Sequence, residues 1–185
     1  MFIKSMSNGF TGMIDVGRNV LFIELSMQGT FIDNEKILEK CLMENFIVIV
    51  DMENFNQKEE LVKLLKTINK RNNKILIWIY CTPIVKLASK IDNVFFNIIL
   101  NKDTNYKKIK DVIVEHYITY NSNFIFYVNT QEEIENVHSI MNKFLIPKKL
   151  IYLSTDGDDI DLLKNNAILN KYNFCPDFKK MMWED

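Results

Sequence analysis

The chain has 185 residues, of which 48% are hydrophobic and 12% aromatic, and its 23 Lys and Arg nearly balance its 24 Asp and Glu. This length fits one domain, and the composition supplies a core and argues against disorder. The balanced charge gives no electrostatic reason to expect a nucleic-acid or anionic-membrane ligand. No apolar run approaches the roughly 20 residues that span a bilayer, and residues 1–6 lack the pattern of a secretory signal. We therefore expect a cytoplasmic protein whose three scattered cysteines, Cys41, Cys81 and Cys175, are reduced.

Six apolar, β-rich segments follow one another along the chain, and segments with helical periodicity separate most of them. These segments are residues 20–25, 46–50, 75–80, 94–100, 124–128 and 150–153. They are apolar on successive residues, which is typical of strands covered on both faces of a parallel sheet. Residues 57–72 and 131–144 each carry apolar side chains on one helical face. The alternation predicts a single α/β domain over residues 1–185, either a partial (βα)6-type barrel or an open, mainly parallel sheet flanked by helices.

Ligands of such folds bind at the carboxyl ends of the parallel strands. The residues that end or follow the predicted strands are 24–28, 51–53, 80–82, 101–102, 129 and 154–156. The candidate cleft residues among them are Ser26, Gln28, Asp51, Glu53, Tyr80, Thr82, Lys102 and Asp156.

Several segments together resemble one enzyme family. Gly17-Arg18 precedes the first predicted core strand, and a strand, turn and helix pattern runs over residues 48–61. A further βαβ pattern covers residues 126–157, and the chain closes on an aromatic and proline pattern over residues 172–183. In these features the chain resembles 7-carboxy-7-deazaguanine synthase, a radical S-adenosylmethionine (SAM) enzyme. The resemblance implies a shortened βα barrel, a homodimer, and chemistry with SAM, a 4Fe–4S cluster and magnesium on 6-carboxytetrahydropterin.

The chain departs from this family at the positions that carry the chemistry. After residues 25–26 the family has Cys-x3-Cys-x2-Cys, where this chain has Gln28, Ile32 and Glu35 in the simplest register. None of these side chains replaces a thiolate on iron. The family's Gly-Gly-Glu-Pro turn, which contacts SAM, reads Asp-Met-Glu-Asn over residues 51–54, so that only Glu53 remains. Lys102 lies near the family's Ser-Pro-Lys position, which has no clean counterpart.

Ligand positions have changed together while packing positions persist, which favours a catalytically inactive relative that acts by binding a protein or a ligand. No 4Fe–4S cluster and no SAM are then expected as cofactors. The expected partner is a second copy of the chain or a related protein. A membrane partner is not expected. Nucleic acid is disfavoured as well, because the basic patch at residues 66–74 lies at the end of a predicted helix, where positive charges are favourable without a ligand.

The alternative is a divergent, non-radical enzyme for a nucleotide-like or pterin-like substrate. It would use Asp51, Glu53 and Lys102, with Asp51 and Glu53 as magnesium ligands. Helix capping by Asp51 or Asn54 explains the same residues without a metal.

Other chemistry-bearing residues have structural explanations. The acidic run at residues 156–161 lacks the register of a calcium loop and predicts a helix start capped by Asp158. His116 and His138 lie in helical segments, and we expect surface or interface positions for both. The three cysteines are most simply small core residues.

Overall fold

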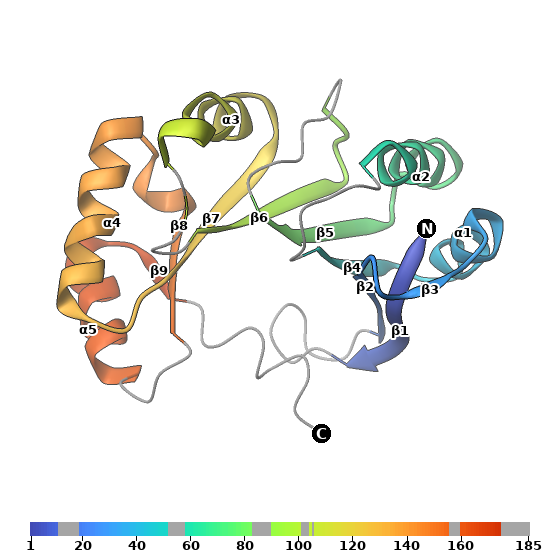
Figure 1. Ribbon diagram of the computed structural model, residues 1–185, viewed down its shortest axis with the longest axis horizontal. Coiled ribbons are helices and arrows are strands. Elements are labelled where there is room, and N and C mark those ends of the chain that lie inside the picture. Colours follow the sequence, from blue (N-terminus) through green and yellow to red (C-terminus); the bar gives the residue numbers. More distant parts are fainter. Residues whose placement is uncertain are drawn as a thin grey trace. The chain divides into compact units, whose positions relative to one another are not determined.

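The structure is a computed structural model, and it describes residues 1–10, 19–51, 58–82, 90–100, 104, 106–155 and 160–174. Within these residues the chain forms an open, mainly parallel sheet with flanking helices (Figure 1). The strands are β1 (Phe2–Phe10), β2 (Asn19–Leu25), β3 (Thr30–Phe31), β4 (Phe46–Asp51), β5 (Leu76–Cys81), β6 (Val94–Leu100), β7 (Asn121–Tyr127), β8 (Ile151–Ser154) and β9 (Asn173–Phe174). The helices are α1 (Asn34–Leu42), α2 (Lys58–Arg71), α3 (Tyr106–Thr119), α4 (Gln131–Phe144) and α5 (Ile160–Asn170), with a 3₁₀ turn at Lys148–Leu150.

The strand order is β3-β1-β2-β4-β5-β6-β7-β8-β9. The pairs β2–β4, β4–β5, β7–β8 and β8–β9 are parallel, which confirms the predicted α/β fold class with its open, mainly parallel sheet. The sequence patterns missed β1, which runs antiparallel to both β2 and β3. Its Ser, Asn and Gly residues interrupt the apolar run by which the other strands were recognised.

The chain divides into two compact units. Unit 1 comprises residues 1–97 with 119–121, and unit 2 comprises residues 98–118 with 122–185, so that β6 contributes residues to both. The single domain over residues 1–185 stays a prediction.

Unit 1 has a core between strands and two helices. Every residue of β4 from Phe46 to Val50 is buried, which is the pattern of a strand covered on both faces. On α2 the predicted apolar face is buried, and α1 lies beside α2 and buries one side of its own (Figure 1). The buried residues of these helices are Leu61, Leu64, Leu65 and Ile68 of α2 and Ile37, Leu38 and Cys41 of α1.

Unit 2 contains α4, whose observed bounds are those predicted from the sequence. The Thr130 side chain accepts a hydrogen bond from the Glu133 N–H at 3.2 Å, and the Glu133 carboxylate accepts one from the Asn129 N–H at 2.6 Å. Such a reciprocal pair satisfies backbone donors at the helix start. The helix ends at Leu145, which has left-handed backbone angles (φ 56°), and the Ile146 N–H donates to the Met141 carbonyl at 3.1 Å. The buried face consists of Ile134, Val137, Met141 and Phe144.

The expected surface position of His116 is wrong. Although α3 is helical as expected, His116 is fully buried, and its Nδ1 lies 3.1 Å from the Ser122 Oγ of β7. A polar partner makes burial of an imidazole tolerable. His138 of α4 is half-buried, with its ring 5.5 Å from that of Tyr172.

The described helices reach at most 14 residues, and none is both long and apolar enough to cross a membrane.

Candidate functional site

The loop between β2 and α1, residues 26–33, begins with a tight turn. The Ser26 Oγ accepts a hydrogen bond from the Gln28 N–H at 3.2 Å, and the Ser26 carbonyl accepts one from the Gly29 N–H at 3.0 Å. Ser26 is buried and Gln28 is exposed. The hydroxyl of Ser26 therefore orders the turn, while the side chain of Gln28 is accessible to a ligand or a partner.

Gly29 allows this turn to lie directly against β1. A Cβ atom at Gly29 would stand 2.3 Å from the carbonyl carbon of Ile3 and 2.7 Å from the backbone nitrogen of Lys4. Because both contacts are to backbone, a side chain at residue 29 would force the loop and the strand apart.

Of the three residues that the resemblance matches to the family's cysteines, Gln28 and Ile32 lie in this loop and Glu35 lies in α1. Gln28 is exposed and Ile32 is half-buried. Glu35 is exposed in the first turn of α1. The N-cap of this helix is Asp33, whose carboxylate accepts a hydrogen bond from the Glu35 N–H at 3.2 Å. These three residues offer an amide, an alkyl group and a carboxylate. Iron–sulfur clusters are held by thiolates, so the donor set of this loop does not fit such a cluster.

The free thiols among the described residues are those of Cys41 and Cys81, and both lie outside this loop. Cys41 is buried in α1 and Cys81 is buried at the end of β5, which confirms both as core residues, whereas Cys175 is outside the described residues. Burial raises the pKa of the Cys41 thiol to about 12. Cys41 is therefore protonated at neutral pH and is a poor metal ligand.

The parallel register of unit 1 brings three candidate residues to one edge of its sheet. Val50 pairs with both Glu24 and Tyr80, and Asp51 pairs with Cys81. Consequently Asp51 at the end of β4, Ser26 directly after β2 and Thr82 directly after β5 have their backbones at the same edge. Thr82 is half-buried, and the side chain of Asp51 is outside what the structure describes.

Tyr80 belongs to a row of aromatic rings on unit 1. It is buried, its ring centroid is 6.4 Å from that of Trp78, and Trp78 is 5.7 Å from Phe46. Residues 78 and 80 share one face of β5 because side chains alternate along a strand. The ring of Tyr80 thus contributes to packing near the edge of the sheet.

Three candidate residues, Glu53, Lys102 and Asp156, lie outside the described residues, as do Asn54 and Asp158, the alternative helix caps. Within the described part of the chain, no group of three or more His, Cys, Asp or Glu side chains is placed to hold a metal ion. The magnesium alternative through Asp51 and Glu53 stays a prediction.

Unit 2 has its own polar residues at the carboxyl ends of β7 and β8. The Thr155 Oγ1 donates to the Asn129 Oδ1 at 2.5 Å, and the Val128 N–H donates to the Ser154 carbonyl at 2.9 Å. Ser154 is fully buried, and its hydroxyl finds no hydrogen-bond partner among the described residues. Asn129 and residues 154–155 were among the strand-end positions that the sequence singles out.

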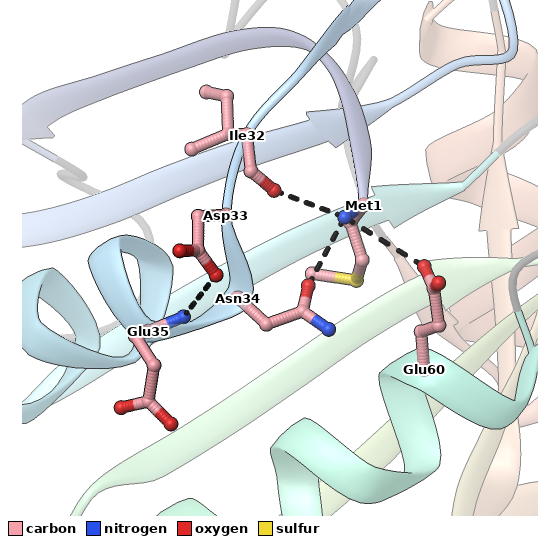
Figure 2. A network of polar contacts seen from close by, with 6 residues as sticks. All are labelled: Met1, Ile32, Asp33, Asn34, Glu35 and Glu60. Atoms are coloured by element: carbon pink, nitrogen blue, oxygen red, sulfur yellow. Dashed lines mark hydrogen bonds and ion pairs between the residues drawn. The ribbon is translucent and has the colours of Figure 1, made fainter.

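Sequence patterns missed two residues that organise the edge of unit 1, Gly29 and Met1. The first residues of the chain lie along the β2–α1 loop, and the α-ammonium group of Met1 contacts that loop (Figure 2). The sequence near these two residues gives one sign of such a role, which is the single glycine between a predicted strand and a helix. The partners of both residues lie far away in the sequence.

Comparison of the sequence with protein-family models and with curated proteins gives no match. Among solved structures, the fold is similar to the crystal structure of QueE from Escherichia coli, a 7-carboxy-7-deazaguanine synthase, with a TM-score of 0.69. The two chains are 15% identical, and the similarity covers 95% of this chain and 92% of QueE. The chain therefore has a fold similar to that of QueE along nearly its whole length.

Proposed function

We propose that this chain is a degenerate relative of 7-carboxy-7-deazaguanine synthase that has no radical chemistry and acts by binding. The observation that carries the proposal is the donor set at the β2–α1 loop and the start of α1, where Gln28, Ile32 and Glu35 stand at the positions that the resemblance matches to the cluster cysteines. The similar fold supports the relation, and the donor set of the loop argues against the reaction. Without thiolates at one loop, a 4Fe–4S cluster has no ligands from this region.

The chemistry of SAM binding argues in the same direction. The resemblance implies that SAM and the 4Fe–4S cluster act together, so a chain without ligands for the cluster has no use for SAM in that chemistry. The residues 51–54 also lack the glycines that let a backbone approach a ligand closely. We infer that neither a 4Fe–4S cluster nor SAM is a cofactor of this chain.

The chain would then bind its partner through exposed residues on its surface. The β2–α1 loop exposes the amide of Gln28. It also exposes the apolar side chains of Met27 and Phe31, which are 49% and 62% exposed. Such a mixture is common where proteins contact one another. We propose a second copy of the chain or a related protein as the partner, in the cytoplasm.

A SAM titration tests the proposal. A ligand that binds the folded state raises its melting temperature in proportion to the logarithm of the ligand concentration above Kd. We expect no shift in the melting temperature across the titration, under anaerobic conditions and after incubation with iron and sulfide. A melting temperature that rises with the logarithm of the SAM concentration would contradict the proposal.

The partner is tested with a tag at the carboxyl terminus, which leaves Met1 unchanged. Light scattering after size-exclusion chromatography gives the mass of the purified chain, where we expect a dimer of the 21.9 kDa chain. If the pure chain is monomeric, expression together with a related protein should give a heterodimer. A monomer under both conditions would remove the proposed partners.

The divergent enzyme would depend on Asp51, Glu53 and Lys102, and of these the structure describes only the backbone of Asp51.

A further inference from the structure

The strand β3 forms an open edge of the sheet in unit 1. Among the described residues, β3 is the last strand in the order, with β1 as its neighbour on one side. In this antiparallel pair Phe31 lies opposite Phe2, and Thr30 lies opposite Ile3. The other side of β3 is therefore available for pairing with a further strand.

The backbone groups of Phe31 point toward this open side. In an antiparallel pair, hydrogen-bonded residue pairs alternate with pairs whose N–H and C=O groups point away from each other. The Ile32 N–H donates to the Met1 carbonyl at 2.9 Å, so the neighbouring pair of Phe2 and Phe31 is of the second kind. In agreement, the Phe2 carbonyl accepts from the Ser26 N–H at 3.5 Å, on the side of β2. Phe31 thus places one donor and one acceptor at the open edge.

Aromatic side chains accompany these backbone groups. The ring centroids of Phe2 and Phe31 are 5.5 Å apart in an edge-to-face arrangement, and the two residues are 38% and 62% exposed. Residues 28–32 contain no charged residue and no proline, which are among the usual means of protecting an edge strand against pairing. An unprotected edge with exposed aromatic rings is suited to a partner strand.

We propose that β3 pairs antiparallel with β3 of a second copy of this chain, across a twofold axis that passes between the two Phe31 residues. The inference rests on the proposed self-association and names the edge through which it takes place. The sheets of the two copies then form one continuous sheet through their first units.

The edge is complementary to itself in this register. Each Phe31 donates its N–H to the Phe31 carbonyl of the second copy, as a hydrogen-bonded antiparallel pair requires. The two Phe31 rings lie side by side, since residues directly opposite each other share a face of the sheet. Beyond them, Thr30 stands opposite Ile32 and Gly29 opposite Asp33, so no like charges meet. A contact of this kind uses the same surface twice and closes after two copies.

The charges of α1, which starts directly after β3, are also compatible with a second copy. Glu35, Lys36, Glu39 and Lys40 are all exposed. A twofold axis perpendicular to the shared sheet makes the two α1 helices antiparallel, so that Glu35 corresponds to Lys40 and Lys36 to Glu39. Opposite charges arranged in this way favour the correct partner and orientation more than they add affinity.

Sedimentation of the 185-residue chain over a range of concentrations tests the proposal. Phe31→Glu removes an aromatic side chain from the centre of the contact and places two carboxylates opposite each other. We expect the dissociation constant of the dimer to rise by about a hundredfold. Ile168→Glu, at a 66% exposed position on α5 of unit 2, is the matched control and should leave the dissociation constant unchanged.

The outcomes separate this inference from the proposed function. A dimer that Phe31→Glu does not weaken would overturn the edge pairing and leave the proposed partner in place. A chain that is monomeric at every concentration would also overturn the edge pairing, and expression with a related protein then tests the proposed function separately.

Engineered cysteines test the register with the aromatic residue intact. The background is Cys175→Ser, and the described native thiols, Cys41 and Cys81, are buried. Thr30→Cys and Ile32→Cys, made in separate chains, would stand opposite each other with Cα atoms about 4.5 Å apart, within the range that a disulfide bridges. Mild oxidation of the mixed chains should give a linked dimer. Each variant alone should give little, because its own copy lies on the diagonal at about 7–8 Å.

Two results of the oxidation would contradict the proposed pairing. One is the absence of a linked dimer from the mixture of the two variants. The other is equal linkage from each variant alone, which would show random collision or another register.

Discussion

Between β7 and α4 the connection consists of residues 128–130, whereas between β2 and α1 it runs over residues 26–33 and includes β3. The short connection is fixed by its own side chains, since Thr130 and Glu133 cap the helix that follows. The long one is fixed from outside, by the ammonium group of Met1 and by the backbone of Ile3 against Gly29. Both connections leave the carboxyl end of a strand. The comparison indicates that the β2–α1 loop depends on distant residues for its order.

The largest effect we expect is on the reactivity of Cys41, in the helix that follows the long loop. Its pKa is raised from 9.0 to about 12, so at pH 8 the thiolate fraction is lower by roughly a thousandfold than for an unperturbed thiol. Alkylation followed by mass spectrometry should leave Cys41 unmodified in the native chain and modify it after denaturation. Native labelling at the denatured rate would show that α1 supplies an accessible thiol beside the loop.

Gly29→Ala should disrupt the long loop. The new Cβ would stand 2.3 Å from the Ile3 carbonyl carbon, and overpacking of this kind costs about 1–3 kcal/mol in the free energy of unfolding. Chemical denaturation measures the loss, with the exposed Gln28→Ala as the matched control, expected within about 0.5 kcal/mol of the unchanged chain. Equal stability of the two variants would mean that the loop does not depend on its contact with β1.

Thr130→Ala tests the short connection. Loss of a side-chain N-cap lowers helix and protein stability by about 1 kcal/mol, and Thr130→Ser retains the hydroxyl and should cost much less. Hydrogen exchange should show the change at the start of α4 and leave residues 26–33 unaffected. A similar loss of protection in residues 26–33 would contradict the local character of this cap.

Leu145→Gly should have the smallest effect, and it should be stabilising. Leu145 ends α4 with φ 56° and is 77% exposed. Glycine relieves the steric cost of this conformation at some cost in chain entropy, for a net gain of about 0.5–1 kcal/mol in the free energy of unfolding. Asn142→Gly, at an exposed position inside the same helix, should instead destabilise by roughly 0.3 kcal/mol, since Gly has a lower helix propensity than Asn. Destabilisation by both substitutions would show that Leu145 contributes packing that its exposure conceals.

The features that the sequence could predict are fixed by residues close together in the chain. Those that it could not predict depend on residues far apart. The bounds of α4 were predicted because its apolar periodicity lies within one stretch of chain. The core strands were predicted from continuous apolar runs, and the convergence of Ser26, Asp51 and Thr82 follows from the parallel order. In contrast, β1 lacks an apolar run, and nothing near Met1 in the sequence indicates that its ammonium group meets Glu60. His116 was misplaced because its partner, Ser122, belongs to the following strand, and a helical pattern does not indicate which polar residue is buried.

The central claim is that the β2–α1 loop cannot ligate a cluster, and anaerobic reconstitution with iron and sulfide tests it most directly. The matched comparison is the triple variant Gln28→Cys, Ile32→Cys and Glu35→Cys, which restores three thiols at the family spacing. After removal of unbound metal, we predict no more iron and sulfide on the unchanged chain than on a denatured sample, and a gain in the triple variant. A stoichiometric 4Fe–4S cluster on the unchanged chain, seen by its visible absorption and its iron content, would contradict the account.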